Sequence, residues 1–556
     1  MVTLKNYLIS LIFEAFDKKV DLDLIKKTTL DSKLKEYDYA STLFISNKTL
    51  DFRLFKDKLL QNKGIVCVEN INGFVNICLD RNFFLNSFNL NLEKEDKNVM
   101  IEFSSPNTNK PLHVGHVRNT LLGNALSNLL LKKYNVIKAN LINDRGIHIC
   151  KSMLAYKRFA KFKSPEEANK KSDLFVGDCY VLFSKAEKEN PDIIKEAESM
   201  LKKWEAKDKD TINLWKKMNR WALDGMKKTY KDLGINFDVW FFESEIYDKG
   251  KEIIFDAYNK GLVELDYELG YIVKYGKRPE DYKVVLRKDG TAIYITQDIY
   301  LAKLKTEKYN LDKSIYVVGS EQNDYFDKLK KIIVHLGMPE IANKIEHYSY
   351  GMISLPSGKL KSREGNIVDA DTLIQDVRTT ALNVLKEKNP NKKEQELISE
   401  SKTIADAAIK YFILKYDAKR DFVFDINSSL SFEGNSGPYL LYTYARICSL
   451  LSKMKESKFT EIKKITNIPT KEELNLSKII LKYKDRLNEA IEKESVHFLV
   501  NYITNLANRF NTIYANVKFI TDNKSEVANR YLLYTKMKLI LEDVFKIMGI
   551  KPLERM

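Results

Sequence analysis

Two histidines, His113 and His116, are the residues of this sequence with the clearest potential for chemistry. They stand where a Ser/Pro/Asn-rich loop leads from a short apolar run into a helical pattern, with Gly115 between them. A helix N-terminus offers unpaired N–H groups and the positive end of its dipole, and glycine lets a ligand approach the backbone. Imidazole N–H groups and the nearby Lys110 can stabilise negative charge on phosphate oxygens. We therefore expect Lys110, His113 and His116 to be catalytic and Gly115 to contact a nucleoside triphosphate. The alternative is that the histidines only cap a helix.

A basic, glycine-bounded loop, GKLKSREG at residues 358–365, follows much later in the chain. Its candidate catalytic residues are Lys359, Lys361, Ser362 and Arg363. Such a loop is common on any basic protein, so its meaning depends on the motif that precedes it.

The sequence HVGH after a first strand resembles the signature of class I aminoacyl-tRNA synthetases and their nucleotidyltransferase relatives. In the same way, GKLKSREG resembles the class I KMSKS loop, which stabilises the pyrophosphate leaving group. Ser362 stands where that motif has its second lysine. This lysine is frequently lost in the arginyl family, in which a lysine just upstream of HxGH is thought to substitute, and Lys110 occupies that place.

Longer blocks are similar to the arginyl-tRNA synthetases in particular, and they extend over most of the chain beyond Val99. The matching blocks are SSPNTNKPLHVGH, NDRGIHICK, GTAIYITQD, GSEQ, EGNSGPYLLYTYARI and the terminal GIKPLERM. The resemblance implies ATP-dependent ligation of L-arginine to tRNA(Arg) through an arginyl-adenylate, with Mg²⁺ accompanying ATP and no structural metal.

The same resemblance implies an arginine site, and a guanidinium calls for bidentate carboxylate recognition. The family's ligands fall on Glu102, Ser105, Pro106, Asn107, His116, Tyr294, Asp298 and Gln322. Asp298 is the expected partner of the guanidinium, assisted by Tyr294 and Glu102. Asn107 and Gln322 are expected to hold the α-amino and carboxylate ends. Without the family context, Tyr294 and Asp298 are equally consistent with a packing pair at a strand end.

Two further residues, Gly319 and Glu321, follow a strand at the point where class I enzymes contact the adenosine ribose. We expect both to bind ATP, with Glu321 accepting hydrogen bonds from the ribose hydroxyls. The alternative is an acidic loop residue with no ligand.

The elements around these motifs predict an α/β protein with a Rossmann-like parallel sheet. Apolar runs at 99–103 and 136–142 flank a helical pattern at 114–133, which is a βαβ unit. A strand is expected at 315–318, and a hairpin at 284–286 and 292–296 that turns at Asp289-Gly290. Near the N-terminus, strands at 64–69 and 74–79 flank an Asn72-Gly73 turn.

Three domains follow from these changes of pattern, and the resemblance to the arginyl family implies their roles. Residues 1–95 are expected to form an additional α+β domain that contacts the tRNA elbow, and 96–432 the catalytic domain. A helical insertion at about 151–245 interrupts the catalytic domain; its charged residues are expected to face solvent, with RNA contact as the alternative. Residues 433–556 are expected to form an all-α anticodon-binding bundle.

The 556 residues carry a formal net charge of +16, which favours a polyanionic partner, although a lysine-rich coding bias would give the same charge. Residues 436–556 hold 21 Lys/Arg against 13 Asp/Glu, so half of the net charge lies in the C-terminal bundle. There we expect Tyr439, Tyr442 and Arg446 to bind tRNA by stacking and hydrogen bonding. Tyr444 belongs to the same aromatic and basic cluster, and for each of these tyrosines a place in the helix core is the alternative.

The five cysteines are scattered without a CxxC pair, so we expect neither a zinc site nor a disulfide framework. No membrane segment is visible, and we expect a cytoplasmic monomer. The rival hypotheses are a class I synthetase for another amino acid, a catalytically silent tRNA-binding paralogue, and a small-molecule nucleotidyltransferase.

Overall fold

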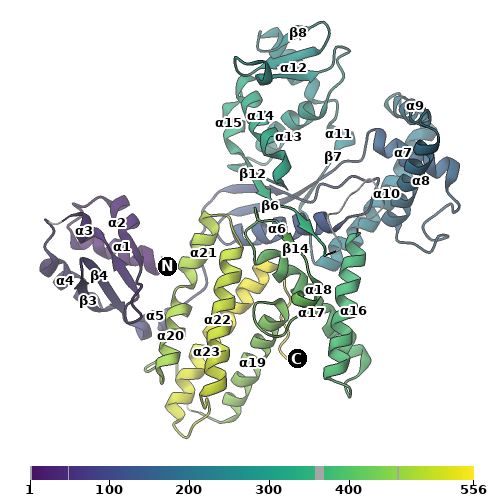
Figure 1. Cartoon of the computed structure of the whole chain (residues 1–556). Helices are drawn as coiled ribbons and strands as arrows, with labels where there is room; N and C mark the ends of the chain where they lie inside the picture. The colour runs from purple at the N-terminus through teal and green to yellow at the C-terminus, as the bar shows by residue number, and fades with distance from the viewer. Residues whose placement is uncertain (1–2, 48, 357–367, 460–461) are drawn as a thin grey trace. The chain divides into compact units, whose positions relative to one another are not determined.

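The computed structural model describes residues 3–47, 49–356, 368–459 and 462–556. They divide into two compact units (Figure 1). The first unit combines Met1–Lys94 with Leu430–Met556, and the second unit is Glu95–Ser429. The three-domain division stays a prediction.

A five-stranded parallel sheet forms the centre of the second unit, with strand order β12-β11-β5-β6-β7. The strands are β5 (Asn98–Glu102), β6 (Asn135–Ile142), β7 (Val239–Phe242), β11 (Lys313–Gly319) and β12 (Ile345–Tyr350). This arrangement confirms the Rossmann-like fold class. The chain enters at the central strand β5 and builds outward in both directions, so the strand order reverses between β5 and β11. Ligands of such sheets bind in the crevice at that point, beyond the carboxyl ends of the strands.

Helix α6 (Val114–Leu130) connects β5 to β6 and is buried almost all round. Its Gly123 lies against the Phe103 ring, because a Cβ there would come within 2.3 Å of the ring's Cγ. Helices α16 (Ala370–Lys388) and α17 (Glu394–Leu414) also contact α6. The short strands β13 (Ile353–Ser354) and β14 (Phe422–Val423) pair in parallel, and α18 (Ile426–Ser429) ends the unit.

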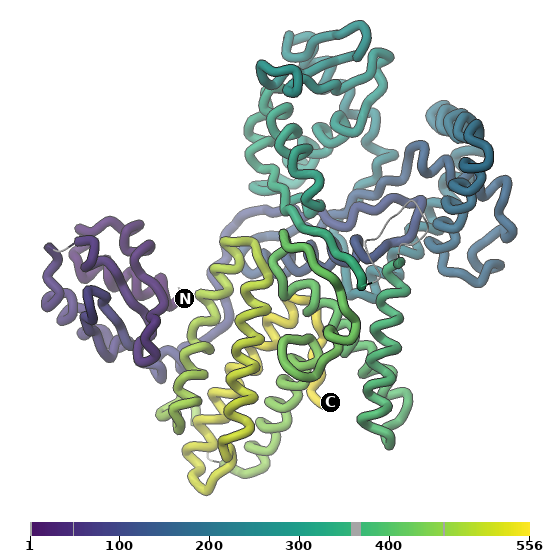
Figure 2. The backbone as a smooth tube through the Cα atoms, viewed as in Figure 1, coloured from purple at the N-terminus to yellow at the C-terminus, as the bar shows by residue number. Residues whose placement is uncertain are grey.

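Between β6 and β7 the structure has four helices with a core of their own, where the helical insertion at about 151–245 was predicted. They are α7 (Ile147–Phe159), α8 (Ser172–Glu189), α9 (Ile193–Glu205) and α10 (Lys209–Leu233). Phe175, Phe183 and Met218 are among the buried residues that hold them together. Figure 2 shows the four helices as one group.

The predicted hairpin at 284–296 is wrong in its second half. Strand β10 (Tyr282–Leu286) pairs instead with β9 (Gly270–Lys274), which pairs in turn with β8 (Glu264–Asp266). Beyond the turn Ala292 forms a single bridge with Leu286, and helix α13 (Tyr294–Lys308) begins two residues later. The physical reason is that Ile295 and Ile299, four residues apart, are both buried in one core.

Four further helices complete this region of the second unit. They are α11 (Glu243–Ile246), α12 (Gly250–Asn259), α14 (Asn323–His335) and α15 (Pro339–Lys344). Helices α12 to α15 pack around the core that contains Ile295 and Ile299.

In the first unit, an antiparallel sheet of order β1-β2-β4-β3 packs with short helices. The strands are β1 (Thr29–Asp31), β2 (Tyr39–Ser41), β3 (Ile65–Ile71) and β4 (Phe74–Leu79). The helices are α1 (Leu4–Ala15), α2 (Leu22–Thr28), α3 (Leu43–Ser46), α4 (Phe52–Leu60) and α5 (Arg81–Asn86). Asn72 (φ 53°) and Gly73 (φ 85°) form the predicted turn between β3 and β4, as a tight hairpin requires.

The C-terminal part of the first unit is entirely helical where it is described, as predicted. Its helices are α19 (Gly437–Glu456), α20 (Lys471–Leu481), α21 (Tyr483–Glu492), α22 (His497–Asn516) and α23 (Lys524–Met548). Across the described ranges of both units, no helix combines the length and the apolar character needed to cross a bilayer.

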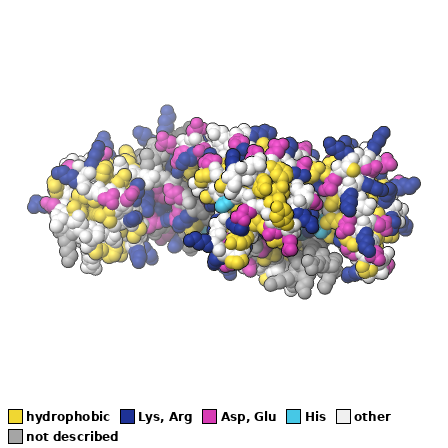
Figure 3. Space-filling model, turned by 90° about the horizontal axis from the view of Figure 1, so that it is seen from above, with side chains coloured by type: hydrophobic (Ala, Val, Ile, Leu, Met, Phe, Trp, Pro, Cys, Tyr) yellow, Lys and Arg dark blue, Asp and Glu magenta, His cyan; other side chains and the backbone are white. Residues whose placement is uncertain are grey.

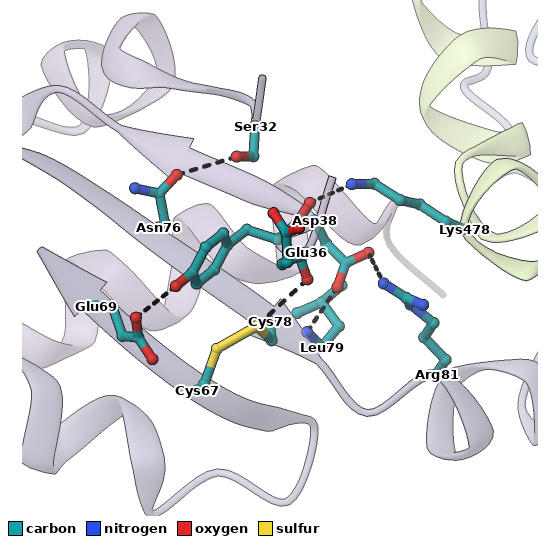
Figure 4. The surroundings of a disulfide bond; sticks show 11 residues. Ser32, Glu36, Asp38, Cys67, Glu69, Asn76, Cys78, Leu79, Arg81 and Lys478 are labelled. Atoms are coloured by element: carbon teal, nitrogen blue, oxygen red, sulfur yellow. Dashed lines mark hydrogen bonds and ion pairs between the residues drawn. A yellow bond between two sulfur atoms is a disulfide. The ribbon is translucent and has the colours of Figure 1, made fainter. Parts of the chain in front are cut away.

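A disulfide joins Cys67 and Cys78, which corrects the expectation of none (Figure 4). The two cysteines are direct partners in the β3–β4 register, with Cα atoms 4.9 Å apart. They are equidistant from the Asn72-Gly73 turn, so the antiparallel register brings their side chains to one place. The remaining cysteines, Cys150, Cys179 and Cys448, are free.

Candidate active site

The loop after β5 turns through two strained residues, Ser104 (φ 73°) and Ser105 (φ 43°). Hydrogen bonds hold both of them. The Ser104 N–H donates to Asn119 Oδ1 (2.5 Å) and the Ser105 N–H to Asn140 Oδ1 (3.0 Å). Ser104 Oγ also shares a hydrogen bond with the Tyr230 hydroxyl (2.6 Å). Buried polar side chains of α6, β6 and α10 thus fix the path of this loop.

The end of β6 holds the next part of the loop. Asn143 donates its backbone N–H to the Pro106 carbonyl (3.0 Å) and its side-chain amide to the Ser105 carbonyl (3.1 Å). Asn107 forms a parallel bridge with Asn143. Three of the predicted arginine ligands, Ser105, Pro106 and Asn107, therefore lie together at the carboxyl ends of β5 and β6.

The two histidines cap the N-terminus of α6 through one nitrogen each. Gly115 N–H donates to His113 Nδ1 (3.1 Å), and His113 N–H donates to His116 Nδ1 (3.1 Å). The imidazole centroids are 3.9 Å apart. The capping role is therefore present, and it fixes the tautomer: because each Nδ1 accepts, each Nε2 carries the proton and can donate to a ligand.

Burial keeps both imidazoles uncharged. It lowers the pKa of His113 to about 4, with a smaller contribution from Lys110, and the pKa of His116 well below its usual value. Burial also lowers the pKa of the Lys110 ammonium. At neutral pH the motif thus presents two neutral N–H donors beside a lysine at the positive end of a helix.

Helix α13 brings Tyr294 and Asp298 to one face, because they are four residues apart. Asp298 accepts a hydrogen bond from the hydroxyl of Tyr325, the third residue of α14. The Tyr294 and Tyr325 rings are 5.6 Å apart. Burial raises the pKa of Asp298 to about 7, despite the opposing effect of the Tyr325 hydrogen bond.

Sequence reasoning missed a second carboxyl group, that of Glu243. Burial raises its pKa to about 7, opposed by the nearby Arg145 and by a hydrogen bond with Gln297. Its charge also acts on Tyr294 and Asp298, which places it in the same cluster. Glu243 directly follows the apolar strand β7, and Glu102 likewise ends β5. An acidic residue at the end of an apolar strand was therefore the sequence signal that could have identified Glu243.

Glu102 is buried and forms an ion pair with Lys305 of α13. Lys305 is another residue that sequence reasoning missed. The Lys305 ammonium lies 4.3 Å from the centroid of the Tyr316 ring. Lys305 is seven residues after Asp298, on the same face of α13, and this spacing was the available signal. Lys305 neutralises Glu102. The two other carboxyls of the cluster, Asp298 and Glu243, form no ion pair with a described residue.

The predicted ATP residues of the next strand lie at the carboxyl end of β11, beside β5. Gly319 is the last residue of β11, and Glu321 follows it in a short 3-10 turn. A Cβ on Gly319 would come within 2.3 Å of the Glu321 carboxylate, so this glycine has the Glu321 side chain directly above it. Gln322 precedes α14, the helix that carries Tyr325. The predicted loop residues Lys359, Lys361, Ser362 and Arg363 lie outside the described residues.

In the first unit, Arg446 lies between two aromatic rings. Its guanidinium is 4.2 Å from the centroid of Tyr442 and 5.1 Å from that of Tyr514, and it donates to the Tyr442 hydroxyl (2.9 Å). Tyr439 donates its hydroxyl proton to Asn508 (2.8 Å). Tyr444 is fully buried, so for this tyrosine the alternative of a helix-core role is correct.

Two family models match the chain. The model described as "tRNA synthetases class I (R), catalytic domain" matches residues 82–426. The model described as "DALR anticodon binding domain" matches residues 440–556. Together they cover both units except for the first 81 residues and a short connection.

Curated relatives extend the match over most of the chain. The arginine–tRNA ligase of Parabacteroides distasonis is 38% identical over 532 residues, which are 90% of this chain and 89% of that protein. That of Treponema denticola is 41% identical over 471 residues, 83% of this chain and 79% of that protein. That of Borrelia garinii subsp. bavariensis is 36% identical over 555 residues, 95% of this chain and 94% of that protein.

Solved structures share the fold at lower sequence identity. The arginyl-tRNA synthetase of Thermus thermophilus superposes with a TM-score of 0.84 at 22% identity, over 100% of both chains. That of Plasmodium falciparum superposes with a TM-score of 0.78 at 20% identity, also over 100% of both chains. By its family models and by relatives of 36–41% identity, the chain belongs to the arginyl-tRNA synthetases, the class I arginine–tRNA ligases.

Proposed function

We propose that this protein activates L-arginine with ATP and transfers the arginyl group to tRNA(Arg). In the first step the arginine carboxylate attacks the α-phosphorus of ATP, giving arginyl-adenylate and pyrophosphate. In the second step the terminal ribose of the tRNA attacks the adenylate through its 2′-hydroxyl, and AMP leaves. One observation carries the proposal. Asp298 and Glu243, two carboxyls that form no ion pair with a described residue, lie in the same α/β unit as helix α6, whose N-terminus the two histidines cap.

Arginine recognition is assigned to the acidic cluster and the strained loop. Asp298 and Glu243 take the guanidinium, since neither forms an ion pair with a described residue, and Tyr294 packs against it. The Glu102–Lys305 pair forms one wall of the cluster. The predicted roles of Ser105, Pro106, Asn107 and Gln322 toward the rest of the amino acid stay part of this proposal.

ATP binding is assigned to the N-terminus of α6 and the end of β11. His113 and His116 donate Nε2–H to phosphate oxygens, and Gly115 permits close approach. Lys110 adds a cation as charge develops during attack on the α-phosphorus. Gly319 and Glu321 receive the ribose, and Lys359, Lys361, Ser362 and Arg363 receive the departing pyrophosphate.

Mg²⁺ enters this proposal with ATP, bound to the phosphates. Within the described ranges, no group of three or more His, Cys, Asp or Glu side chains is placed to hold a metal ion. We therefore assign no residue of this chain to the ion, and it supplies charge neutralisation on the triphosphate when bound.

Transfer RNA is assigned to the first unit. The Tyr442–Arg446–Tyr514 stack offers aromatic and guanidinium planes to unpaired anticodon bases, and Tyr439 lies one turn before it. The predicted contact of residues 1–95 with the tRNA elbow stays part of this proposal. A cytoplasmic location and a monomeric state complete the proposal.

Charging of total tRNA with each of the twenty amino acids in turn tests this function. We expect arginine alone to be attached. His116→Ala is expected to lose about 100- to 1,000-fold in kcat, because it removes one donor from the phosphate site. His335→Ala, which removes an imidazole hydrogen-bonded to the Leu262 carbonyl, is the matched control. Charging with another amino acid would favour another class I synthetase, and tRNA binding without charging would favour a silent paralogue.

A further inference from the structure

We infer that Lys171 and Asp371 are positioning residues for His113, through which the helical insertion sets the geometry of adenylate formation. The inference rests on the proposed function. It concerns residues that touch neither nucleotide nor amino acid in that proposal. Three contacts carry it, all within the second unit.

The first contact is a backbone pairing on the motif itself. His113 forms an antiparallel bridge with Asp369. The Val114 N–H donates to the Val368 carbonyl (3.3 Å), and the Ala370 N–H donates to the Leu112 carbonyl (2.9 Å). The residues that begin helix α16 therefore hold the backbone of His113 from one side.

The second contact ties the start of α16 to the insertion. Lys171 Nζ donates to Asp371 (2.6 Å), to Asp173 (3.1 Å) and to the Thr229 hydroxyl (2.5 Å). Thr229 Oγ1 donates in turn to Asp371 (3.0 Å). Lys171 and Thr229 belong to the insertion, at the N-cap of α8 and within α10, whereas Asp371 lies in the first turn of α16.

This cluster is tightly enclosed. The side chain of Asp173 is fully buried, and those of Lys171 and Asp371 are 18% and 29% exposed. A Cβ on Gly225 would come within 2.3 Å of Asp173, so α10 packs directly on this carboxyl. Lys171 is the only described cation bonded to either aspartate, and its removal leaves two neighbouring carboxylates without neutralisation.

The third contact joins the motif directly to the insertion. Pro111, two residues before His113, packs against Gly177 of α8, where a Cβ would lie 2.6 Å from the proline Cδ. The segment 111–114 is thus held by α8 at Pro111 and by residues 368–370 from Leu112 to Val114. Helix α8 is part of the insertion, and residues 368–370 are tied to it through Asp371 and Lys171. We therefore infer that a shift of the insertion displaces the His113 imidazole.

The test measures arginine-dependent ATP–pyrophosphate exchange in the presence of tRNA. Lys171→Met is expected to lower kcat about 10- to 100-fold, as displacement of a catalytic group by about 1 Å does, while KM for arginine changes less than about twofold. Lys171→Arg is expected to restore most of kcat, because a guanidinium can bond both aspartates. Lys170→Met is the control: its neighbouring pair with Asp178 (2.6 Å) is half exposed, and we expect no change.

Gly177→Ala is a second variant that reaches the same imidazole without touching a charge, and we expect a lower kcat for it too. Equal kcat for Lys171→Met and Lys170→Met would overturn the inference. So would a loss that falls on KM for arginine, or one that Lys171→Arg does not restore, since both indicate general destabilisation. If the wild-type chain shows no exchange with arginine, the proposed function fails instead.

Discussion

At the scale of single residues, burial raises the pKa of Asp298 and Glu243 to about 7, so each carboxyl is about half protonated at neutral pH. A guanidinium placed between them favours their ionised forms. We therefore expect arginine binding to release protons and arginine affinity to rise with pH. Below pH 7 the carboxyls are neutral and bind the cation weakly, whereas above pH 7 both are charged.

We expect arginine affinity to increase from pH 6 to pH 8. The expected increase is up to about tenfold per pH unit for each carboxyl below its pKa. Isothermal titration calorimetry at pH 7, in two buffers of different ionisation enthalpy, measures the protons released. We expect about half a proton from each carboxyl, and Glu243→Gln should remove its share. The control is Glu245→Gln, which changes an exposed carboxyl two residues away. Affinity that does not vary between pH 6 and pH 8 would contradict this account.

Among the site residues, sequence reasoning found those that belong to a contiguous motif. His113 and His116 are three residues apart, and their capping geometry at the start of α6 follows from this spacing. Glu243, Tyr325 and Lys305 reach the cluster from three separate elements. Only the tertiary fold brings these elements together. Local spacing could therefore indicate Lys305, seven residues after Asp298 on the same helix, but not Glu243 or Tyr325.

At the scale of elements, helix α13 is joined to the central strand by one buried ion pair. Lys305 is fully buried, and its partner Glu102 is 8% exposed. Two such charges stabilise the fold only as a pair, because either one alone would be buried without neutralisation. The pair therefore fixes how the Tyr294–Asp298 face of α13 meets β5.

Lys305→Met should lower the free energy of unfolding of the second unit by about 3–5 kcal/mol. Lys303→Met on the same helix breaks an exposed ion pair with Glu307 (3.9 Å). It should change the free energy of unfolding by less than about 0.5 kcal/mol. Urea unfolding followed by tryptophan fluorescence reports on this unit alone, because all four tryptophans lie within it.

The double substitution Glu102→Gln with Lys305→Met should recover part of the loss, because it leaves no buried charge. Equal stability of the Lys305→Met and Lys303→Met variants would show that the ion pair does not hold α13 to β5.

Element boundaries near α13 show where sequence patterns are insufficient. The run Ala292–Thr296 alternates over too few residues to distinguish a strand end from a helix start. The helical repeat of Ile295 and Ile299 was present, but it competed with a strong Asp289-Gly290 turn signal. The disulfide was missed for a related reason, since pairing Cys67 with Cys78 requires the register of β3 and β4 as well as their existence.

At the scale of the whole molecule, the chain carries a net charge of +16, half of it within residues 436–556. On the face shown in Figure 3, lysine and arginine side chains alternate with acidic and hydrophobic ones. Such a surface favours RNA through many separate phosphate contacts, and its affinity must fall with salt. We expect the aromatic stack on Arg446 to make a different contribution, because base stacking does not depend on counterion release.

Tyr442→Ala should weaken tRNA binding by about 10- to 100-fold at every salt concentration. The slope of log Kd against log salt should stay that of the wild type, because no phosphate contact is lost. Fluorescence titration of labelled tRNA from low to physiological salt measures both quantities. A changed slope with unchanged affinity at low salt would assign Tyr442 to the phosphate backbone instead of a base.

The parallel sheet, the helical insertion and the helical C-terminus could be predicted, because each is encoded by long periodic stretches of sequence. The junctions near Lys94 and Ser429 divide the chain into two units, and the grouping of the N-terminal segment with the distant C-terminal helices was not foreseen. Contacts such as Lys482 with Asp31 create that grouping across more than four hundred residues, beyond the reach of any local pattern.

The central claim is that two carboxyls select a guanidinium for activation at the HVGH motif. The most direct measurement compares ATP–pyrophosphate exchange with arginine and with citrulline, its uncharged isostere, in the presence of tRNA. We predict that wild-type kcat/KM for arginine exceeds that for citrulline by about 10,000-fold or more. Asp298→Asn should remove most of this advantage by lowering the value for arginine. Comparable exchange with citrulline in the wild type, or full discrimination in Asp298→Asn, would contradict the account.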